Sequence, residues 1–294
     1  EKKFNNISSF NFTREAFGDG VWDGITTKAR GLYIDTKNQE VVARGYEKFF
    51  NYNEKSITSP EMLSRNLVFP VSVYVKENGF LGIMSTDHEG SPIFATKSNI
   101  GGDTHAKWFE KNMLNIYGAD TIEKMRRFAY DNNVSFVFEV IDIKHDPHII
   151  KYKKNECILL DIIKNNMKFE KYPYIEMCEV ATDLGLEHKY LDTIIEDYNG
   201  LTKFIAKATA DNFVMTTDRI DDKCIEGFVF EDKNGFMFKL KVPYYNEWKM
   251  LRGVARQVIK SGSIRYTGAL QSVVSNYFYG WCKEKFNTLE KEER

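Results

Sequence analysis

The sequence lacks the features that define several specialised classes of protein. Its 294 residues include only four cysteines, and no two of them form a C-x-x-C pair. This scatter argues against a zinc knuckle or a disulfide framework and predicts reduced thiols in an intracellular, cytoplasmic protein. No apolar run approaches the length of a membrane span, so we expect no membrane partner. The cysteines are Cys157, Cys178, Cys224 and Cys282.

A surplus of charge of one sign is also missing. The chain has 41 Lys and Arg residues against 42 Asp and Glu, which leaves a formal net charge of −1. Total charge therefore gives no argument for a nucleic-acid partner. A local basic groove is still compatible with this balance, because electrostatic steering depends on the local field. What the sequence does contain is apolar: 43% hydrophobic and 14% aromatic residues are enough for a folded core.

Alternating apolar segments predict that β-strands dominate the first two thirds of the chain. Helical spacing predicts a helix in 121–132 and another around Leu191, Ile194, Ile195 and Tyr198. Because strands and helices do not alternate regularly, we expect the α+β class, with mainly antiparallel sheets and flanking helices. The predicted strands are 31–35, 71–75, 135–143, 157–163, 225–232 and 235–242.

The character of the chain changes near residue 245. Beyond it, apolar residues from Trp248 to Val258 follow a helical period, and little resembles a strand. We therefore expect a main domain over residues 1–245 and a small helical C-terminal domain over 246–294.

Several charged side chains stand on strand faces where they need partners. Lys76 ends an alternating segment on its more polar face, just before Asn78 and Gly79. Glu139 is flanked by apolar residues, and an unpaired carboxylate would be costly there. Glu226 lies beside aromatic residues and a glycine. Two further lysines share one strand face, where like charges repel unless an anion or solvent separates them; these are Lys239 and Lys241.

Together these residues suit nucleotidyl transfer. A lysine amine such as Lys76 can attack the α-phosphate of ATP and form a phosphoramidate. It must first be neutral, and its ordinary pKa is about 10.4, so we expect neighbouring cations and a bound metal to lower that pKa. Lys239 and Lys241 would offset phosphate charge. Taken singly, each residue is better explained as a solvated lysine or a salt-bridged carboxylate; only the ordered set favours a nucleotide site.

At this point the chain resembles the covalent nucleotidyltransferase superfamily of RNA ligases, DNA ligases and capping enzymes. Segments before and after Lys76 are similar to the corresponding segments in one branch of this superfamily. That branch contains phage-type RNA ligase 1 and the ligase domain of fungal tRNA ligases. These segments are "KARGLYID" (28–35), "VVARGYEKFFNYNE" (41–54) and "FATKSNIGGDTHAKW" (94–108), and the similarity covers roughly 28–252. The superfamily motifs are matched by "KENG" (76–79), "FE" (138–139), "EGFV" (226–229) and "KLK" (239–241).

The resemblance implies a nucleotidyltransferase fold of the ATP-grasp-like ligase type and a role for each matched residue. Lys76 would carry AMP taken from ATP, with Gly79 turning the chain tightly beside the nucleotide. Asn78 stands where relatives often have Asp, so it brings no charge. Glu139 would bind ribose and Glu226 would serve a Mg²⁺ or Mn²⁺ site. Phosphates would be contacted by Arg30, Lys48, Lys239 and Lys241, adenine by Phe50, and the nucleotide more loosely by Lys97.

The implied activity is that of an ATP-dependent RNA ligase that joins 5′-phosphate and 3′-hydroxyl RNA ends through lysyl-AMP and RNA-adenylate, in RNA repair or tRNA splicing. Its partners would be RNA ends, tRNA among them, and we expect a monomer. Attached end-healing kinase or phosphatase domains, and a requirement for a 2′-phosphate at the 3′ end, stay open. The alternatives are a DNA ligase or capping-type nucleotidyltransferase, or an RNA-binding module with a decayed nucleotide site.

The segment "KHDPHII" contains His145 and His148, which are spaced as in some metal sites. No third ligand is evident nearby. We interpret the segment as a polar turn with one packed histidine.

Overall fold

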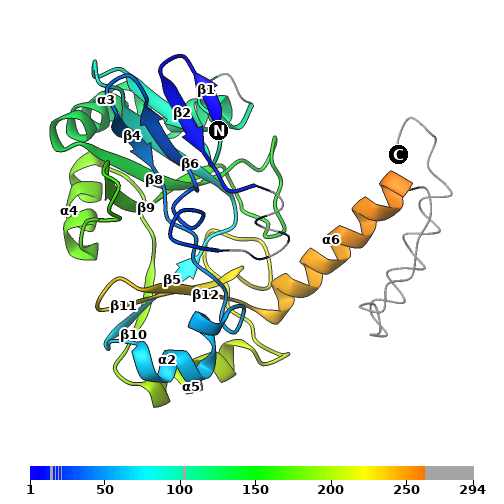
Figure 1. Ribbon diagram of the computed structural model, residues 1–294. Helices are drawn as coiled ribbons and strands as arrows, with labels where there is room; N and C mark the ends of the chain where they lie inside the picture. Colours follow the sequence, from blue (N-terminus) through cyan, green and yellow to red (C-terminus); the bar gives the residue numbers. More distant parts are fainter. Residues whose placement is uncertain (14–15, 17, 19, 21, 102–103, 262–294) are drawn as a thin grey trace.

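The computed structural model describes residues 1–13, 16, 18, 20, 22–101 and 104–261, and its strands form three four-stranded antiparallel sheets (Figure 1). The first sheet has the order β1 (Lys2–Phe4), β2 (Ile7–Phe10), β3 (Leu32–Asp35) and β4 (Glu40–Arg44). The second has the order β10 (Leu191–Ile195), β5 (Val71–Lys76), β11 (Gly227–Asp232) and β12 (Met237–Lys241). The third has the order β7 (Pro92–Ala95), β6 (Phe80–Thr86), β8 (Val134–Ile141) and β9 (Glu156–Lys164).

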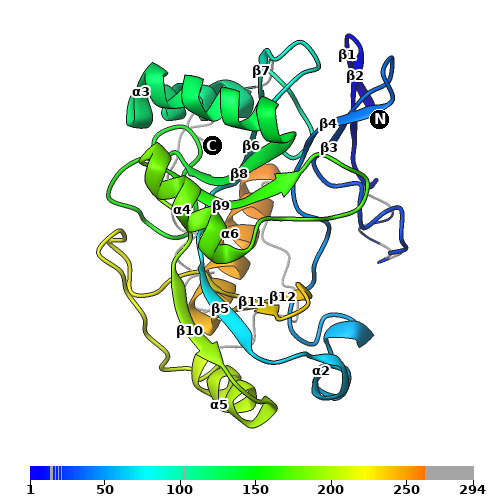
Figure 2. The same cartoon turned by 90° about the vertical axis from the view of Figure 1, so that its left-hand side faces the viewer.

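Helices pack against one face of the second sheet and one face of the third. Figure 2 shows α3 and α4 beside the third sheet, and α5 beneath β10. Phe109 of α3 and Met177 of α4 are fully buried in one core cluster with Phe138 of β8. The helices are η1 (Ser56–Thr58), α2 (Pro60–Asn66), α3 (Thr104–Asn132), α4 (Tyr174–Leu184), α5 (Tyr198–Ala208) and α6 (Pro243–Ser261).

The prediction of an α+β fold with antiparallel sheets is confirmed, and each of the six predicted strands corresponds to an observed one. The predicted helix at 121–132 is the second half of α3, whose helical path is interrupted at Gly118 (φ 80°, ψ 166°). The first half of α3, from Thr104, has no counterpart among the predicted helices.

The helix predicted around Leu191 to Tyr198 is wrong. Leu191–Ile195 is the strand β10, which pairs antiparallel with β5, and Ile195 is buried opposite Val71. A helix does follow, but it begins at Tyr198, because the Asp197 side chain caps it by accepting a hydrogen bond of 2.7 Å from the Gly200 N–H. A short apolar segment fits both periods, and here pairing with a neighbouring strand decides.

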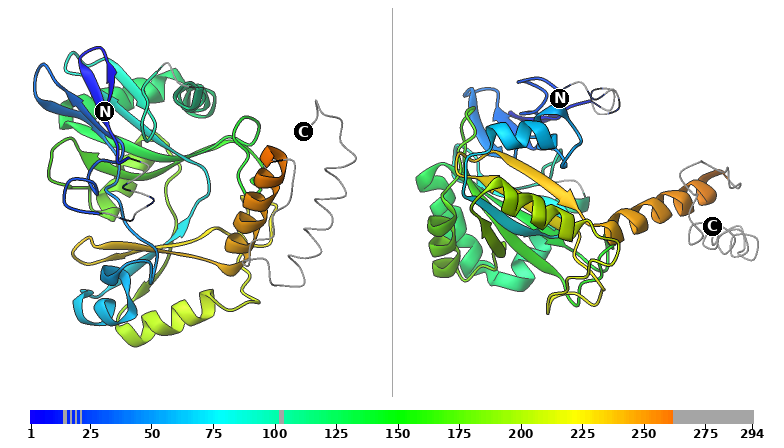
Figure 3. Two further views of the ribbon diagram at one scale, coloured as in Figure 1. Left: turned by 45° about the vertical axis from the view of Figure 1, so that its right-hand side comes forward. Right: turned by 90° about the horizontal axis from the view of Figure 1, so that it is seen from below.

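The long helix α6 extends away from the sheets (Figure 3). It begins at Pro243 and contains Trp248 and Leu251, as the helical period there predicts. The expected division into domains at 245 stays a prediction, and most of the expected C-terminal domain, 262–294, lies outside the described residues. No helix in the described part of the chain is long and apolar enough to cross a membrane.

The second sheet has two contrasting faces, which is why it can build a site. Val73 and Val75 of β5 point into a core cluster that also contains Phe228 and Phe230 of β11. The opposite face carries the polar residues in cross-strand rows. Those rows are Lys76–Gly227–Lys241, Tyr74–Val229–Lys239 and Ser72–Glu231–Met237.

Candidate active site

A cavity of about 400 Å³ opens over this polar face, between the second sheet and the other two. Basic side chains outnumber carboxylates in its lining, so it suits a polyanion despite the neutral charge of the whole chain. The basic lining residues are Arg30, Lys48, Lys76, Lys97, Lys189, Lys239 and Lys241, and the acidic ones are Glu77, Glu139 and Glu226. Of the residues predicted from the sequence, only Phe50 is not among the lining residues.

Glu226 directly precedes Gly227, the central residue of the row that carries Lys76, and it lies between the two lysines of that row. Its two carboxylate oxygens are shared: Lys76 Nζ lies 3.1 Å from Oε2 and Lys241 Nζ lies 2.7 Å from Oε1. The Asn78 side-chain amide also donates to Oε2, at 2.8 Å. Burial raises the pKa of Glu226, but Lys76 and Lys241 lower it more, so the pKa lies below its ordinary value and the carboxylate is charged.

The state of Lys76 differs from the expectation that its pKa is lowered. Burial lowers the pKa of its amine, but Glu226 and then Glu139 outweigh that effect, and the net shift is upward. Without nucleotide, Lys76 is therefore a charged ammonium that must lose a proton before it can act as a nucleophile.

Asn78 links the nucleophile loop to a second loop. Besides its bond to Glu226, its side-chain oxygen accepts from the Ile150 N–H at 3.1 Å, and its own N–H donates to the Tyr152 hydroxyl at 2.9 Å. An amide can donate and accept at once, whereas a carboxylate here would face Glu226 as a second negative charge. The neutral residue is therefore well suited to this position.

Gly79 brings the chain against β8. Its N–H donates to Glu139 Oε1 at 2.7 Å, which gives that carboxylate a partner among its apolar neighbours. A Cβ at this position would lie 2.2 Å from the Val140 carbonyl oxygen, a backbone atom that cannot move aside locally. The glycine is needed for this close approach rather than for a positive φ.

Lys239 is held among other cations. Burial, and after it the positive charges of Lys76, Lys48, Arg30 and Lys241 in that order, together lower the pKa of its amine to about 7. Burial also lowers the pKa of Lys48 and of Lys97, and each feels the positive charge of Arg30. Such a cluster stores electrostatic repulsion, which a bound anion would relieve.

Two adjacent aromatic residues have different positions. Phe49 lines the cavity, and the Lys239 amine lies 5.1 Å from its ring centroid. Phe50 is buried and does not line the cavity. Its ring centroid lies 5.6 Å from that of Trp22 and 4.1 Å from the Lys48 amine nitrogen. Phe50 thus supports Lys48, and Phe49 is the aromatic ring that a ligand would meet.

The inner end of the cavity was missed by sequence reasoning. Tyr46, Tyr74 and Lys189 line it together with apolar side chains. The signal that could have identified this end is Asp161, a lone acid in the otherwise apolar strand "CILLDII". A buried carboxylate predicts cationic partners, although not which lysines supply them.

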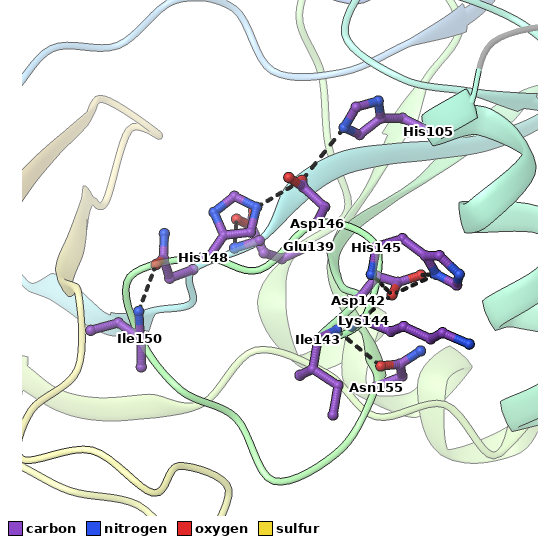
Figure 4. A network of polar contacts seen from close by, with 12 residues as sticks. His105, Glu139, Asp142, Ile143, Lys144, His145, Asp146, His148, Ile150 and Asn155 are labelled. Atoms are coloured by element: carbon purple, nitrogen blue, oxygen red, sulfur yellow. Dashed lines mark hydrogen bonds and ion pairs between the residues drawn. The ribbon is translucent and has the colours of Figure 1, made fainter. Parts of the chain in front are cut away.

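The two histidines of "KHDPHII" belong to separate carboxylate pairs (Figure 4). His145 contacts Asp142 at 3.0 Å and stacks on Trp108, and His148 contacts Asp146 Oδ2 at 2.9 Å. His105, from the start of α3, also lies 3.5 Å from Asp146 Oδ2. The sequence did not predict that this third histidine is nearby. Of these, only His148 lines the cavity. Within the described ranges, no group of three or more His, Cys, Asp or Glu side chains could hold a metal ion.

The sequence also matches known proteins. The tRNA ligase 1 of Schizosaccharomyces pombe is 26% identical over 321 residues, covering 100% of this chain and 38% of that protein. The tRNA ligase of Candida albicans is 25% identical over 279 residues, covering 82% and 32%. The chain thus spans about a third of the length of these curated relatives.

Solved structures of low sequence identity share the fold. An archaeal ATP-dependent RNA ligase superposes with a TM-score of 0.54 at 15% identity, covering 90% of this chain and 62% of that one. A putative ATP-dependent DNA ligase from Aquifex aeolicus gives 0.54 at 13%, covering 89% and 65%. The fold alone therefore does not separate RNA from DNA ligases. The sequence profile described as RNA ligase, however, matches residues 28–245, and the chain accordingly belongs to the RNA ligase family.

Proposed function

We propose that this chain is an ATP-dependent RNA ligase that carries AMP on Lys76. The observation that carries the proposal is the position of the Lys76 amine, paired with Glu226 at 3.1 Å inside a cavity whose charged lining residues are mostly basic. A half-buried lysine at the end of a strand, next to a cluster of other basic side chains, suits attack on a phosphate. Family membership makes RNA the expected substrate.

In the first step the Lys76 amine attacks the α-phosphorus of ATP, an N–P bond forms, and the bond to the departing pyrophosphate breaks. The amine must first release its proton to solvent, so its contact with Glu226, which favours the charged form, has to weaken when the nucleotide binds. Lys241 lies in the row of Lys76 and Lys239 lies in the next row of the sheet, and both would stabilise negative charge on the phosphates. Arg30, Lys48 and Lys97 would hold the rest of the triphosphate.

Two further steps would complete the joining. A 5′-phosphate oxygen of RNA attacks the AMP phosphorus, so the N–P bond breaks and RNA-adenylate forms. The 3′-hydroxyl of the other end then attacks the 5′-phosphate, the phosphodiester forms, and AMP leaves. In both steps the protein contributes position and charge stabilisation.

A divalent ion, Mg²⁺ or Mn²⁺, would neutralise phosphate charge during these steps. The described residues fit an ion that arrives with the nucleotide better than one bound by the protein alone, because Glu226 already contacts two lysines and an amide. Glu226 stays our candidate for contact with the ion, through water. Glu139, beside Gly79, is the candidate for the ribose hydroxyls.

The aromatic contact to adenine we assign to Phe49 rather than Phe50, since only the former lines the cavity. We further propose RNA ends, including tRNA, as the macromolecular partner, and a monomer in the cytoplasm. The fungal relatives are tRNA ligases and are much longer, so end-healing domains elsewhere in a longer polypeptide would fit this chain.

A ligation assay on defined ends tests the substrate class. We expect the protein with ATP and Mg²⁺ or Mn²⁺ to join a 5′-phosphate RNA to a 3′-end, supplied with and without a 2′-phosphate. A nicked DNA duplex with the same base sequence should not be joined. Joining of nicked DNA but not RNA, or nucleotidyl transfer from GTP alone, would favour the DNA-ligase or capping alternative. RNA binding with neither joining nor adenylation would favour the decayed module.

A further inference from the structure

The inner end of the cavity is built around Asp161, a fully buried carboxylate on β9. It accepts hydrogen bonds from the Lys189 amine at 2.8 Å, the Lys171 amine at 3.2 Å and the Tyr46 hydroxyl. A register shift in the pairing of β8 with β9 lies beside it, as expected where a bulge redirects a side chain. Asp161 is therefore satisfied and is positioned to hold other groups in place.

The two lysines of this cluster have different surroundings. Lys171 is shared between two carboxylates, since it also contacts Glu231 at 2.8 Å, and it does not line the cavity. Lys189 has Asp161 as its one carboxylate contact among the described residues, and it lines the cavity. An ammonium has three N–H groups. Lys189 thus has donor capacity beyond its bond to Asp161, although its side chain is only 5% exposed.

An aromatic ring fixes the direction of the Lys189 amine. The nitrogen lies 4.2 Å from the centroid of the Tyr74 ring, a cation–π distance. Tyr74 is two residues from Lys76 on the same face of β5, a separation of about 7 Å along a strand. Around it the lining is apolar, with Leu160, Val229 and Met237. The cavity therefore has a basic end at Lys76 and a largely apolar inner end that contains the buried Lys189 amine.

We propose that the Lys189 amine, held by Asp161 and Tyr74, donates a hydrogen bond to a ring nitrogen of the purine base. This inference rests on the proposed function, because it assumes a nucleotide with its α-phosphate near Lys76. An apolar slot accepts the flat faces of a purine, and its ring nitrogens N1, N3 and N7 are acceptors that need a donor when desolvated. Asp161 is then a positioning residue for base recognition.

A purely structural role for Lys189 would be to balance the charge of Asp161. That role predicts a loss of folding stability on substitution, but no dependence on the atoms of the base. The two accounts can therefore be separated by changing the nucleotide instead of the protein.

The experiment measures self-adenylation of the intact chain with ATP and with 1-deaza-, 3-deaza- and 7-deaza-ATP. We expect one of the three analogues to raise the KM of the wild type by about 10- to 100-fold, the range for a hydrogen bond to a charged group, with kcat within about twofold. Lys189→Met should raise the KM for ATP by a similar factor. For this variant, the KM for that analogue should equal the KM for ATP, because the hydrogen bond is already absent. Lys171→Met, which removes the other lysine on Asp161, is the matched control and should keep the KM.

Equal use of all three analogues and ATP by the wild type would overturn the proposal, and so would an unchanged KM for ATP in a folded Lys189→Met. If Lys189→Met does not fold, the wild-type analogue series decides alone. Adenylation of the wild type that is indifferent to the analogues would leave the proposed function standing. No adenylation of the wild type at all would refute both.

Discussion

Glu226 and Lys239 show that the ionisation of this site is set by single contacts. Glu226 has a lysine at each oxygen, so it stays charged and keeps Lys76 protonated until a nucleotide is present. Lys239 contacts no carboxylate among the described residues and is surrounded by cations, so its amine loses its proton more readily. Neighbouring lysines on one sheet face thus have opposite shifts in pKa.

This difference predicts that nucleotide binding takes up a proton. In the protein without nucleotide, the Lys239 amine has a pKa of about 7 and is therefore mostly neutral at pH 8. Bound phosphates would raise that pKa and favour the ammonium, so ATP affinity should fall as pH rises above 7. Titration calorimetry at pH 8 in two buffers of different ionisation enthalpy should show uptake of up to about one proton.

Lys239→Met provides the control for this linkage. It should weaken ATP binding and also remove most of the proton uptake. Equal uptake by the wild type and the variant would assign the proton to another group and contradict the account of Lys239.

At the scale of elements, the site depends on strands that approach more closely than side chains normally allow. Gly227, the glycine of "EGFV", has φ +155°, and a Cβ there would lie 2.0 Å from the Leu240 carbonyl oxygen. This approach aligns β11 with β12, so Glu226 and Lys241 meet. The atom in the way belongs to the backbone, which cannot rotate aside.

Gly227→Ala should therefore separate β11 from β12. We expect a loss of about 1–3 kcal/mol in the free energy of unfolding, the range for overpacked interiors, together with loss of adenylation. Gly253→Ala is the matched control: Gly253 lies in α6, a Cβ added to it would meet no atom of the described residues within 4 Å, and alanine favours helix there. Urea unfolding of both variants checks the prediction. Equal stability of Gly227→Ala and the wild type would contradict it.

The sequence allowed the strands to be predicted where alternation was clear, as at Val71–Lys76, because period two also assigns the faces. It did not allow β10 to be predicted, since its identity depends on pairing with β5. Nor could it join Asp161 to Lys189, because a bulge and a long connection set that contact. Phe49 and Phe50 are adjacent in sequence, and only their packing shows which of them lines the cavity.

At the scale of the whole molecule, the total charge is nearly balanced, whereas the charge around the cavity is positive. The net charge of the chain is −1, yet among the described residues seven Lys or Arg and three Glu side chains line the cavity. Total charge could not have revealed this, because the sheets bring together residues from Arg30 to Lys241. Membership of the RNA ligase family and the geometry around Lys76 both favour a covalent nucleotide as the link between ATP and RNA.

The most direct test of the role of Lys76 is incubation of the purified chain with α-labelled ATP and Mg²⁺ or Mn²⁺, followed by denaturing electrophoresis. We expect an acid-labile, base-stable label on the protein, absent from Lys76→Ala and present in the control Lys207→Ala, a surface lysine of α5. Treatment with pyrophosphate beforehand would remove any AMP carried through purification. A wild type that takes up no label after that treatment, or a Lys76→Ala variant labelled like the wild type, would contradict the central role given to Lys76.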